Sequence, residues 1–351
     1  MAISTQELDP KAHALSELLI ELDSVVVAYS GGVDSAYLAS AALDALGSGR
    51  VLAVTGRSPS YPAVQREMAL RLAESIGLPH LEIETREMDS AGYVVNSGRR
   101  CFFCKRELYG RLIAIARERE MRAVVDGSNA DDRHDHRPGM AAARKLGVRS
   151  PLQDVGLTKA EIRALSKRAE LPTWDAPASP CLASRLAYGV PVTVERLRHV
   201  ERAEAALREL RGWSALRVRD HGDLARLELG SDDTAVLADD ELRDRAASAL
   251  RSAGFSRACL DLQGYRRGAL NEALGGRSQS GARRPSPELA TRALADRGIS
   301  AAIEGGGRDA DVALVRPLGE AAQPRALLRR GDEIVAACRD AGYRFVALAL
   351  D

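Results

Sequence analysis

The chain has 351 residues, of which 45% are hydrophobic and 28% charged, a composition typical of a folded globular protein. Its 50 Lys and Arg side chains balance 49 Asp and Glu side chains, so the net charge of +1 does not demand a polyanionic partner such as RNA. No apolar run is long enough to cross a bilayer, and the start lacks the basic and then apolar pattern of a signal peptide, so we expect a cytoplasmic protein without a membrane partner.

Strand-like and helix-like segments alternate over roughly the first 150 residues. We predict strands at 25–30, 51–56, 80–85 and 122–127, separated by helices near 36–46, 62–76 and 105–119. This alternation predicts an α/β fold with a doubly wound parallel sheet and helices on both faces. Ligands of such sheets bind beyond the carboxyl ends of the strands, which is where the sequences SGGVDS, TGRSPS and GSNADD lie.

The rest of the chain changes character at two Pro-, Ser- or Gly-rich stretches. One breaks up the helical segment that starts at 158, and the other, GGRSQSGARRPSP, has the composition of a linker. Between them the pattern predicts a helix, two strands, a helix and a strand. We therefore expect a first domain at 1–157, a junction at 158–189, a small α+β domain at 190–273, a linker at 274–286 and a C-terminal extension at 287–351.

The extension contains a partial echo of the segment before it. Residues 249–262 align without gaps on residues 337–350 with six identical positions, including Gly254 with Gly342. A helix, a Gly stop, an aromatic residue and a strand also form a common αβ pattern, so duplication and coincidence both remain open. The composition of the extension leaves open an extra module, an oligomer contact or a binding surface.

The loop between the first predicted strand and its helix is built to hold an anion. Adjacent glycines let backbone N–H groups close around phosphate, with two hydroxyls and a helix N-terminus beside them. A Walker loop would need Gly-Lys, and a dinucleotide fold G-x-G-x-x-G, and neither occurs here. The alternative is an ordinary turn with an N-cap. The residues are Ser30, Gly31, Gly32, Val33, Asp34 and Ser35.

SGGVDS resembles the PP-loop of the N-type ATP pyrophosphatases, which split ATP into AMP and pyrophosphate to adenylate a substrate. The resemblance implies that Asp34 and the flanking hydroxyls lie near pyrophosphate and Mg²⁺. It also implies that Thr55, Gly127 and Asn129 lie near the adenosine and the α-phosphate. The loop has no Lys, so we expect Mg²⁺ and arginines to neutralise the phosphates.

Five cysteines, an odd number, argue against a disulfide framework. Cys259 and Cys338 fall in apolar patterns and are interpreted as core residues. Cys101 and Cys104 form a C-x-x-C pair, and Cys181 lies in the junction. Zinc completed by His134 and His136, or no metal at all, are open alternatives. Three thiolates with a fourth position free suit a [4Fe-4S] cluster that binds an exogenous sulfide.

Further motifs resemble the LarE family, the sulfur transferases of nickel-pincer nucleotide (lactate racemase) cofactor synthesis. They are WDAPASPCLASRLAYG, GSNADDRHDHRPG, LGVRSPL and LDLQGYRRGALN, and the resemblance spans about 10–273. It implies ATP-dependent conversion of the carboxylates of pyridinium-3,5-biscarboxylic acid mononucleotide to thiocarboxylates. Some members sacrifice the sulfur of the cysteine matching Cys181, whereas three-cysteine members hold a cluster. The resemblance also implies a homo-oligomer and other enzymes of the cofactor's synthesis as partners, and leaves the sulfide source unknown.

The same resemblance assigns roles to residues beyond the loop and the cysteines. Ser184 and Arg185 would flank the reacting centre together with Cys181 and Asp34, and Arg217, Arg219 and Glu228 would contact the phosphate of the nucleotide substrate or pyrophosphate. Glu204 is interpreted as a surface charge. The rival enzymes are a cluster-dependent tRNA thiolase, against which the near-neutral charge speaks, and an ammonia-using ligase, which leaves the cysteines unexplained. A non-enzymatic metal or redox scaffold would not account for the intact SGGVDS.

Overall fold

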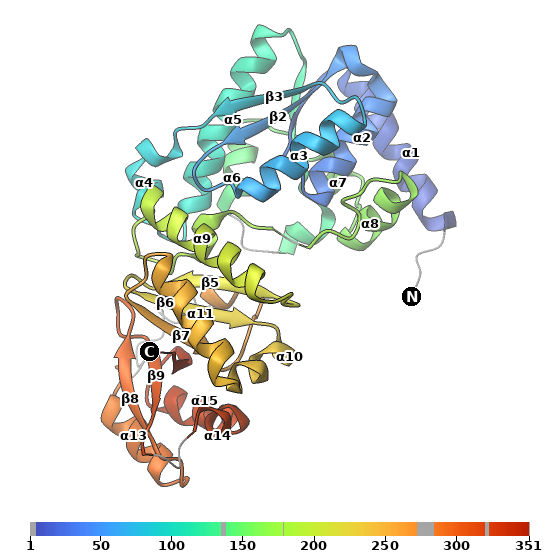
Figure 1. The fold of residues 1–351 in the computed structure, drawn as a ribbon. Helices are drawn as coiled ribbons and strands as arrows, with labels where there is room; N and C mark the ends of the chain where they lie inside the picture. The colour runs from blue at the N-terminus through green and yellow to red at the C-terminus, as the bar shows by residue number, and fades with distance from the viewer. Residues whose placement is uncertain (1–4, 135–137, 178, 272–283, 320–322, 351) are drawn as a thin grey trace. The chain divides into compact units, whose positions relative to one another are not determined.

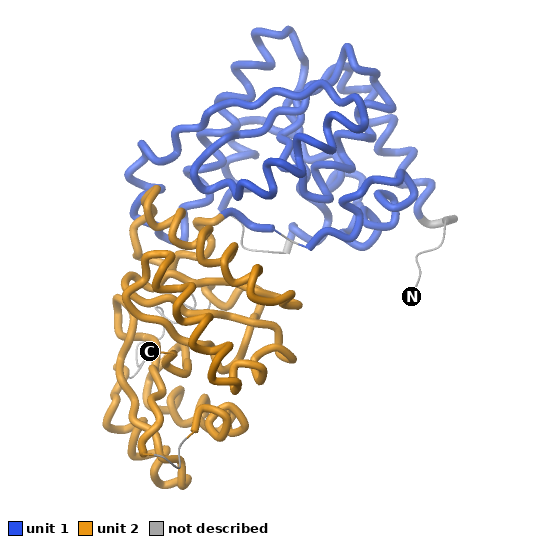
Figure 2. Tube along the Cα trace, in the orientation of Figure 1, with its two compact units in different colours: residues 1–181 blue, residues 182–351 orange. Residues whose placement is uncertain are grey.

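The structure, a computed structural model, describes residues 5–134, 138–177, 179–271, 284–319 and 323–350. The chain forms two compact units, Met1–Cys181 and Leu182–Asp351 (Figure 2). This division falls inside the predicted junction at 158–189. Most of the predicted linker lies outside the described residues.

The first unit is built on a four-stranded parallel sheet (Figure 1). Its strands are β1 (Val25–Ala28), β2 (Val51–Arg57), β3 (His80–Glu84) and β4 (Ala123–Val125), in the order β3-β2-β1-β4. The helices are α1 (Thr5–Leu22), α2 (Val33–Leu46), α3 (Ala63–Ser75), α4 (Ala91–Val94), α5 (Arg100–Glu118), α6 (Pro138–Lys145), α7 (Pro151–Asp154) and α8 (Lys159–Arg168). All pairs β1–β2, β1–β4 and β2–β3 are parallel, so the predicted α/β fold is confirmed.

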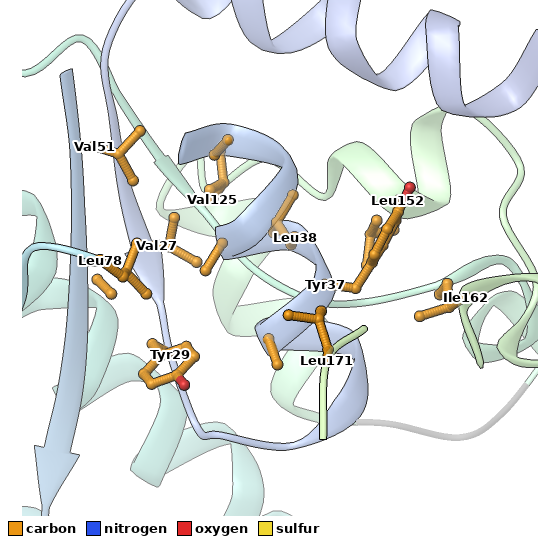
Figure 3. Packing of buried hydrophobic residues seen from close by; sticks show 14 of the residues in the cluster. Val27, Tyr29, Tyr37, Leu38, Val51, Leu78, Val125, Leu152, Ile162 and Leu171 are labelled. Atoms are coloured by element: carbon orange, nitrogen blue, oxygen red, sulfur yellow. The ribbon is translucent and has the colours of Figure 1, made fainter. Parts of the chain in front are cut away.

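Helices cover both faces of this sheet, and the alternation of side chains along β1 shows why. Val25 and Val27 pack on one face in a cluster with residues of α1, α2, α3 and α8 (Figure 3). Val26 and Ala28 point to the other face and pack with residues of α5 and α6. Because both faces are covered, β1 is apolar throughout and forms a continuous β-branched run in the sequence.

β1 lies inside the sheet, between β2 and β4. β2 pairs with one side of β1 and β4 with the other. The strand order reverses at this point, and ligands of open α/β sheets bind at such switch points, beyond the carboxyl ends of the strands. The loop after β1 is SGGVDS and the loop after β4 starts at Asp126.

The second unit has one six-stranded mixed sheet in the order β5-β6-β7-β10-β9-β8. The predicted helix, two strands, helix and strand of 190–265 are confirmed as α9 (Val194–Leu210), β5 (Leu216–Asp220), β6 (Leu224–Leu229), α11 (Asp240–Ser252) and β7 (Arg257–Asp261), with the short α10 (Ser231–Thr234) after β6. The C-terminal extension continues the same sheet with α13 (Pro287–Ala295), β8 (Ala301–Gly306), β9 (Val312–Pro317), α14 (Pro324–Arg329), α15 (Gly331–Asp340) and β10 (Phe345–Ala349). Among the described residues no helix is long and apolar enough to cross a membrane.

Candidate active site

The SGGVDS loop is closed by hydrogen bonds between its own ends. The Ser35 hydroxyl accepts from the N–H of Ser30 at 3.1 Å and donates to the carbonyl of Gly32 at 3.1 Å. Val33 is the first residue of α2, so the loop leads directly into the helix N-terminus. Tyr61, just before α3, donates its hydroxyl to the Ser30 carbonyl at 2.9 Å. The loop is therefore a closed turn that leads directly into the N-terminus of α2.

Two of the glycines are required by the packing around the loop. Gly31 has φ +65°, and a Cβ there would lie 2.4 Å from Cβ of Ala69. A Cβ on Gly127, after β4, would lie 2.9 Å from the backbone nitrogen of Ser35, so only glycine allows the two loops to approach. Gly32 has an ordinary φ of −75°, and its nearest neighbour would be a hydroxyl at 3.5 Å. The protein itself therefore does not require glycine at position 32.

A lysine from outside the loop reaches Asp34. The ammonium of Lys159, the first residue of α8, lies 2.7 Å from a carboxylate oxygen of Asp34. The helix start is fixed by a capping box, in which Thr158 and Glu161 hold each other's backbone N–H groups. The sequence prediction, which searched for a Lys within the loop, missed Lys159. The Thr-x-x-Glu capping pattern of α8, with Lys159 at its first position, was the available signal.

Thr55 and Asn129 were predicted to lie near the nucleotide. In the structure their side chains make hydrogen bonds to other residues of the protein. The Thr55 hydroxyl is 2.9 Å from the carbonyl oxygen of Tyr29 and 2.8 Å from Nε2 of His80. The side-chain oxygen of Asn129 accepts the N–H of Asp131 at 3.0 Å. Both residues are buried, and their side-chain oxygens are engaged by these contacts. Any contact with ATP remains a prediction.

The three cysteines come together at one place in the first unit. Cys101 and Cys104 lie in the first turns of α5, and Cys181 ends the unit. Burial raises the pKa of the Cys104 thiol to about 12, and the nearby Cys181 and Glu87 add to the shift. Cys101 is exposed, but its thiol is partly desolvated by its neighbours, and this, together with Cys181, raises its pKa. Cys259 and Cys338 are buried core residues, as predicted.

Two buried polar residues beside the cysteines were missed by the sequence analysis. Glu87 is 2% exposed, and one of its oxygens lies 3.5 Å from the hydroxyl of Ser60. Tyr93 is 1% exposed, and burial holds the pKa of its hydroxyl well above the usual range, with Cys181 adding to the effect. Neither residue belongs to a recognisable motif, so only the fold brings them to the thiols.

The donor set at this place fits an iron–sulfur cluster in kind, because three neighbouring thiols are the soft ligands that such clusters take. As placed, however, no group of three His, Cys, Asp or Glu side chains within the described residues is arranged to hold a metal ion. His136, one of the two histidines considered for zinc, lies outside the described residues, as does the side chain of His134.

The second unit carries an arginine-rich cluster around Ser184. The guanidinium of Arg185 makes two hydrogen bonds to Glu204, at 3.0 and 3.2 Å, and Glu204 is 2% exposed. The interpretation of Glu204 as a surface charge is therefore wrong, because α9 turns it toward β5 instead of toward solvent. Burial alone would raise the pKa of Glu204, but Arg185 and other arginines outweigh burial and the net shift is downward.

Arg219 and Arg217 extend this cluster along β5. Arg219 lies 2.8 Å from Glu228 on β6 and donates to the carbonyl of Ser184 at 3.2 Å. Arg217 stacks over Tyr265 at 5.4 Å from the ring centre, and desolvation together with the nearby Arg185 lowers its pKa. The site residues predicted for the second unit are thus brought together. Guanidinium groups outnumber carboxylates here, and this favours an anionic ligand.

The strand, SGGVDS loop and helix at a switch point define the first unit as a PP-loop ATP pyrophosphatase fold. In agreement, the family model "NAD synthase" matches residues 17–99. A relative from Lactiplantibacillus plantarum, named pyridinium-3,5-bisthiocarboxylic acid mononucleotide synthase, is 36% identical over 76% of this chain and 96% of its own length. An uncharacterized protein from Synechocystis is 42% identical over 76% of this chain and 99% of its own. The chain belongs to the LarE family of sulfur transferases, of which the named synthase is a member.

A solved NMN synthetase from Francisella tularensis is 23% identical, with a TM-score of 0.40, and the match covers 50% of this chain and 76% of that one.

Proposed function

We propose that this protein is an ATP-dependent sulfur transferase that converts pyridinium-3,5-biscarboxylic acid mononucleotide to its bisthiocarboxylic acid for nickel-pincer nucleotide synthesis. The observation that carries the proposal is that an intact SGGVDS loop and three neighbouring thiols belong to the same compact unit. The name of the Lactiplantibacillus relative supports the substrate. Its physiological partners would be other enzymes of this synthesis, and we expect it to work in the cytoplasm.

The first half-reaction is adenylation of a substrate carboxylate. A carboxylate oxygen attacks the α-phosphorus of ATP, the bond to the β-phosphate oxygen breaks, and pyrophosphate leaves. The N–H groups at the start of α2 and the hydroxyls of Ser30 and Ser35 would bind pyrophosphate. Asp34 would hold Mg²⁺, and Lys159 would turn from Asp34 to a phosphate oxygen. Gly32, which the protein does not require for its own packing, would donate its N–H to the phosphates.

The second half-reaction replaces AMP by sulfur. A carbon–sulfur bond forms at the activated carbonyl, and the carbon–oxygen bond to AMP breaks. Cys101, Cys104 and Cys181 are the residues that would hold a [4Fe-4S] cluster, which when bound supplies an open iron that carries sulfide. The buried Tyr93 and Glu87 would line the inner side of this place. The alternative is that Cys181 gives up its own sulfur once per chain.

The arginines of the second unit would bind the phosphate of the nucleotide substrate. Arg217 is the candidate for direct contact, because it is the more accessible of the two β5 arginines. Arg219 is 7% exposed and tied to Glu228, so we assign it the role of supporting the site. Ser184 and Arg185 lie beside them.

The test measures iron, acid-labile sulfide and product per chain after strictly anaerobic purification. About four iron and four sulfide, with several thiocarboxylates formed per chain, would support the cluster. The alanine variants of Cys101, Cys104 and Cys181 should lose iron and multiple turnover together, whereas Cys338→Ala serves as the matched control. One thiocarboxylate per chain without iron identifies Cys181 as a sacrificial donor. Pyrophosphate release without any thio product would overturn the proposed sulfur transfer.

A further inference from the structure

The second unit contains the same arrangement twice. β5 and β6 form an antiparallel hairpin, α11 follows, and β7 returns parallel to β6. In the C-terminal extension β8 and β9 form an antiparallel hairpin, α15 follows, and β10 returns parallel to β9. A helix precedes each hairpin, α9 in the first case and α13 in the second.

The second strand of each hairpin and the strand that returns beside it agree residue by residue at a shift of 88 residues. The first strands, β5 and β8, are related by a shift of 85, since Leu216 pairs with Leu229 and Ala301 with Pro317. Leu224 pairs with Arg257 where β6 meets β7, and Val312 pairs with Phe345 where β9 meets β10, each partner advanced by 88 residues. The same shift relates the N–H of Arg257, which bonds to the Asp223 carbonyl, to the N–H of Phe345, which bonds to that of Asp311. It also relates the helix-ending glycines 254 and 342, with φ of +115° and +98°. Coincidence of a common αβ pattern does not produce matching strand registers and matching loop bonds.

The two copies meet about a local two-fold axis. β7 and β10 are antiparallel, and Leu260 pairs with Leu348, which is its own counterpart in the repeat. The N–H of Leu262 bonds to the Val346 carbonyl at 3.0 Å, and the N–H of Leu350 bonds to the Ala258 carbonyl at 3.0 Å. The shift of 88 residues exchanges these two bonds. Contacts that map onto themselves in this way are the signature of an isologous dimer interface.

We infer that the extension occupies, within one chain, the position of a second subunit along β7. The partner that the β7 edge fits is therefore a second copy of this fold, and residues 287–351 supply that copy internally. An uncovered β7 would present a row of unpaired backbone groups, which is a template for pairing with another chain. The Synechocystis and Lactiplantibacillus relatives match about three quarters of this chain over nearly their whole length, which leaves room for only one of the two copies.

The first experiment tests, in the intact protein, whether β10 pairs with β7 of its own chain. Ala349 pairs with Cys259 across β7 and β10, so Ala349→Cys places two thiols opposite each other. Under mild oxidation we expect an intrachain disulfide, seen on a non-reducing gel as a monomer and located by peptide mapping. Ala347→Cys is the matched control, since Ala347 pairs with Asp261 on the same strands. A disulfide that links the introduced thiol at position 349 to Cys259 of another chain would overturn the inference.

The second experiment tests whether β7 pairs with β7 of another chain once β10 has been displaced from it. Leu348→Pro removes the N–H that faces β7 at the local axis and introduces a ring into the ladder, so it should release the second copy whether or not that copy stays folded. In this background Leu260→Cys should then link two chains, because residue 260 would pair with itself across the axis. Ala258→Cys in the same background should not, since residue 258 would pair with residue 262. Leu260→Cys with the native extension should remain unlinked. Equal crosslinking of the 258 and 260 variants, or none in either, would contradict pairing through β7.

Discussion

Lys159 and Asp34 lie 2.7 Å apart although 125 residues separate them along the chain. The contact brings the start of α8 to the start of α2, so the positive charge that the SGGVDS loop lacks comes from a helix at the far end of the same unit. A Lys in this position can exchange its carboxylate partner for a phosphate oxygen when a nucleotide binds.

Replacing Lys159 by Met should impair the ATP half-reaction. A charge-assisted hydrogen bond contributes about 1.5–3 kcal/mol, so kcat/KM for ATP should fall about 10- to 100-fold in a pyrophosphate-release assay. Lys167→Met, near the other end of α8, is the control and should leave the rate unchanged. An unaltered rate for the Lys159 variant would mean that this lysine only supports the loop.

Alanine substitutions at Gly31 and Gly32 should have different effects, the first on stability and the second on ATP binding. Gly31→Ala forces a side chain into the left-handed region, at a cost of about 1–2 kcal/mol, and into Ala69, so thermal unfolding should shift to lower temperature. Gly32→Ala has an ordinary backbone and room for a methyl group, so its unfolding temperature should match the wild type while ATP binding weakens. Calorimetric unfolding and ATP titration separate the two effects. Equal ATP affinity in Gly32→Ala and wild type would place the phosphates elsewhere.

Glu204 should make stability depend on acidic pH. Its pKa is lowered from 4.5 in the folded state, so its contribution is fully present above pH 4.5 and is lost as the pH falls through the lower folded value. Breaking a buried pair costs about 3–5 kcal/mol, so Glu204→Gln should unfold at clearly lower denaturant at pH 7. The difference from wild type should shrink when the measurement is repeated at a pH below 4.5. Glu209→Gln, on the same helix but outside the buried ion pair, should show no such difference at either pH.

The Cys104 thiol should react slowly with alkylating reagents. With its pKa raised to about 12, only a minute fraction is thiolate at neutral pH, and the labelling rate should rise about tenfold for each pH unit. Mass spectrometry of iodoacetamide-treated apoprotein at pH 7, 8 and 9 measures this. The urea-unfolded chain, in which the thiol returns to its ordinary pKa, should label much faster. Equal rates in the folded and unfolded chains would show that Cys104 is not desolvated.

Local patterns predicted the first unit well and the charged clusters poorly. The four strands and the SGGVDS loop follow from periodicity and glycine spacing, which act over a few residues. The ion pairs of Lys159 and Glu204 depend on how distant helices pack. Glu204 was misjudged because its helix carries many charges, and only the position of Arg185 in space decides which of them is buried. Glu87 and Tyr93 belong to no motif at all.

The extension was only partly predictable for a related reason. The alignment of 249–262 with 337–350 was visible, but six identities do not separate common descent from a common pattern. Strand order and register distinguish duplication from coincidence, because they relate residues such as Leu260 and Leu348 that pair only in the folded sheet.

Joining two copies in one chain has a consequence that two identical chains cannot have, because each copy is free to change by itself. Arg226 of β6 is fully buried, and its guanidinium lies 4.1 Å from the ring centre of Phe345. The counterpart of Phe345 in the first copy is Arg257, so two identical copies would place an arginine against Arg226. The fused pair keeps Arg226 in one half and supplies an aromatic ring from the other. The β5 arginines that we propose to bind the phosphate of the substrate nucleotide have Ala302 and Glu304 as their counterparts in β8. Loading of the protein with that nucleotide should therefore saturate at one equivalent per chain.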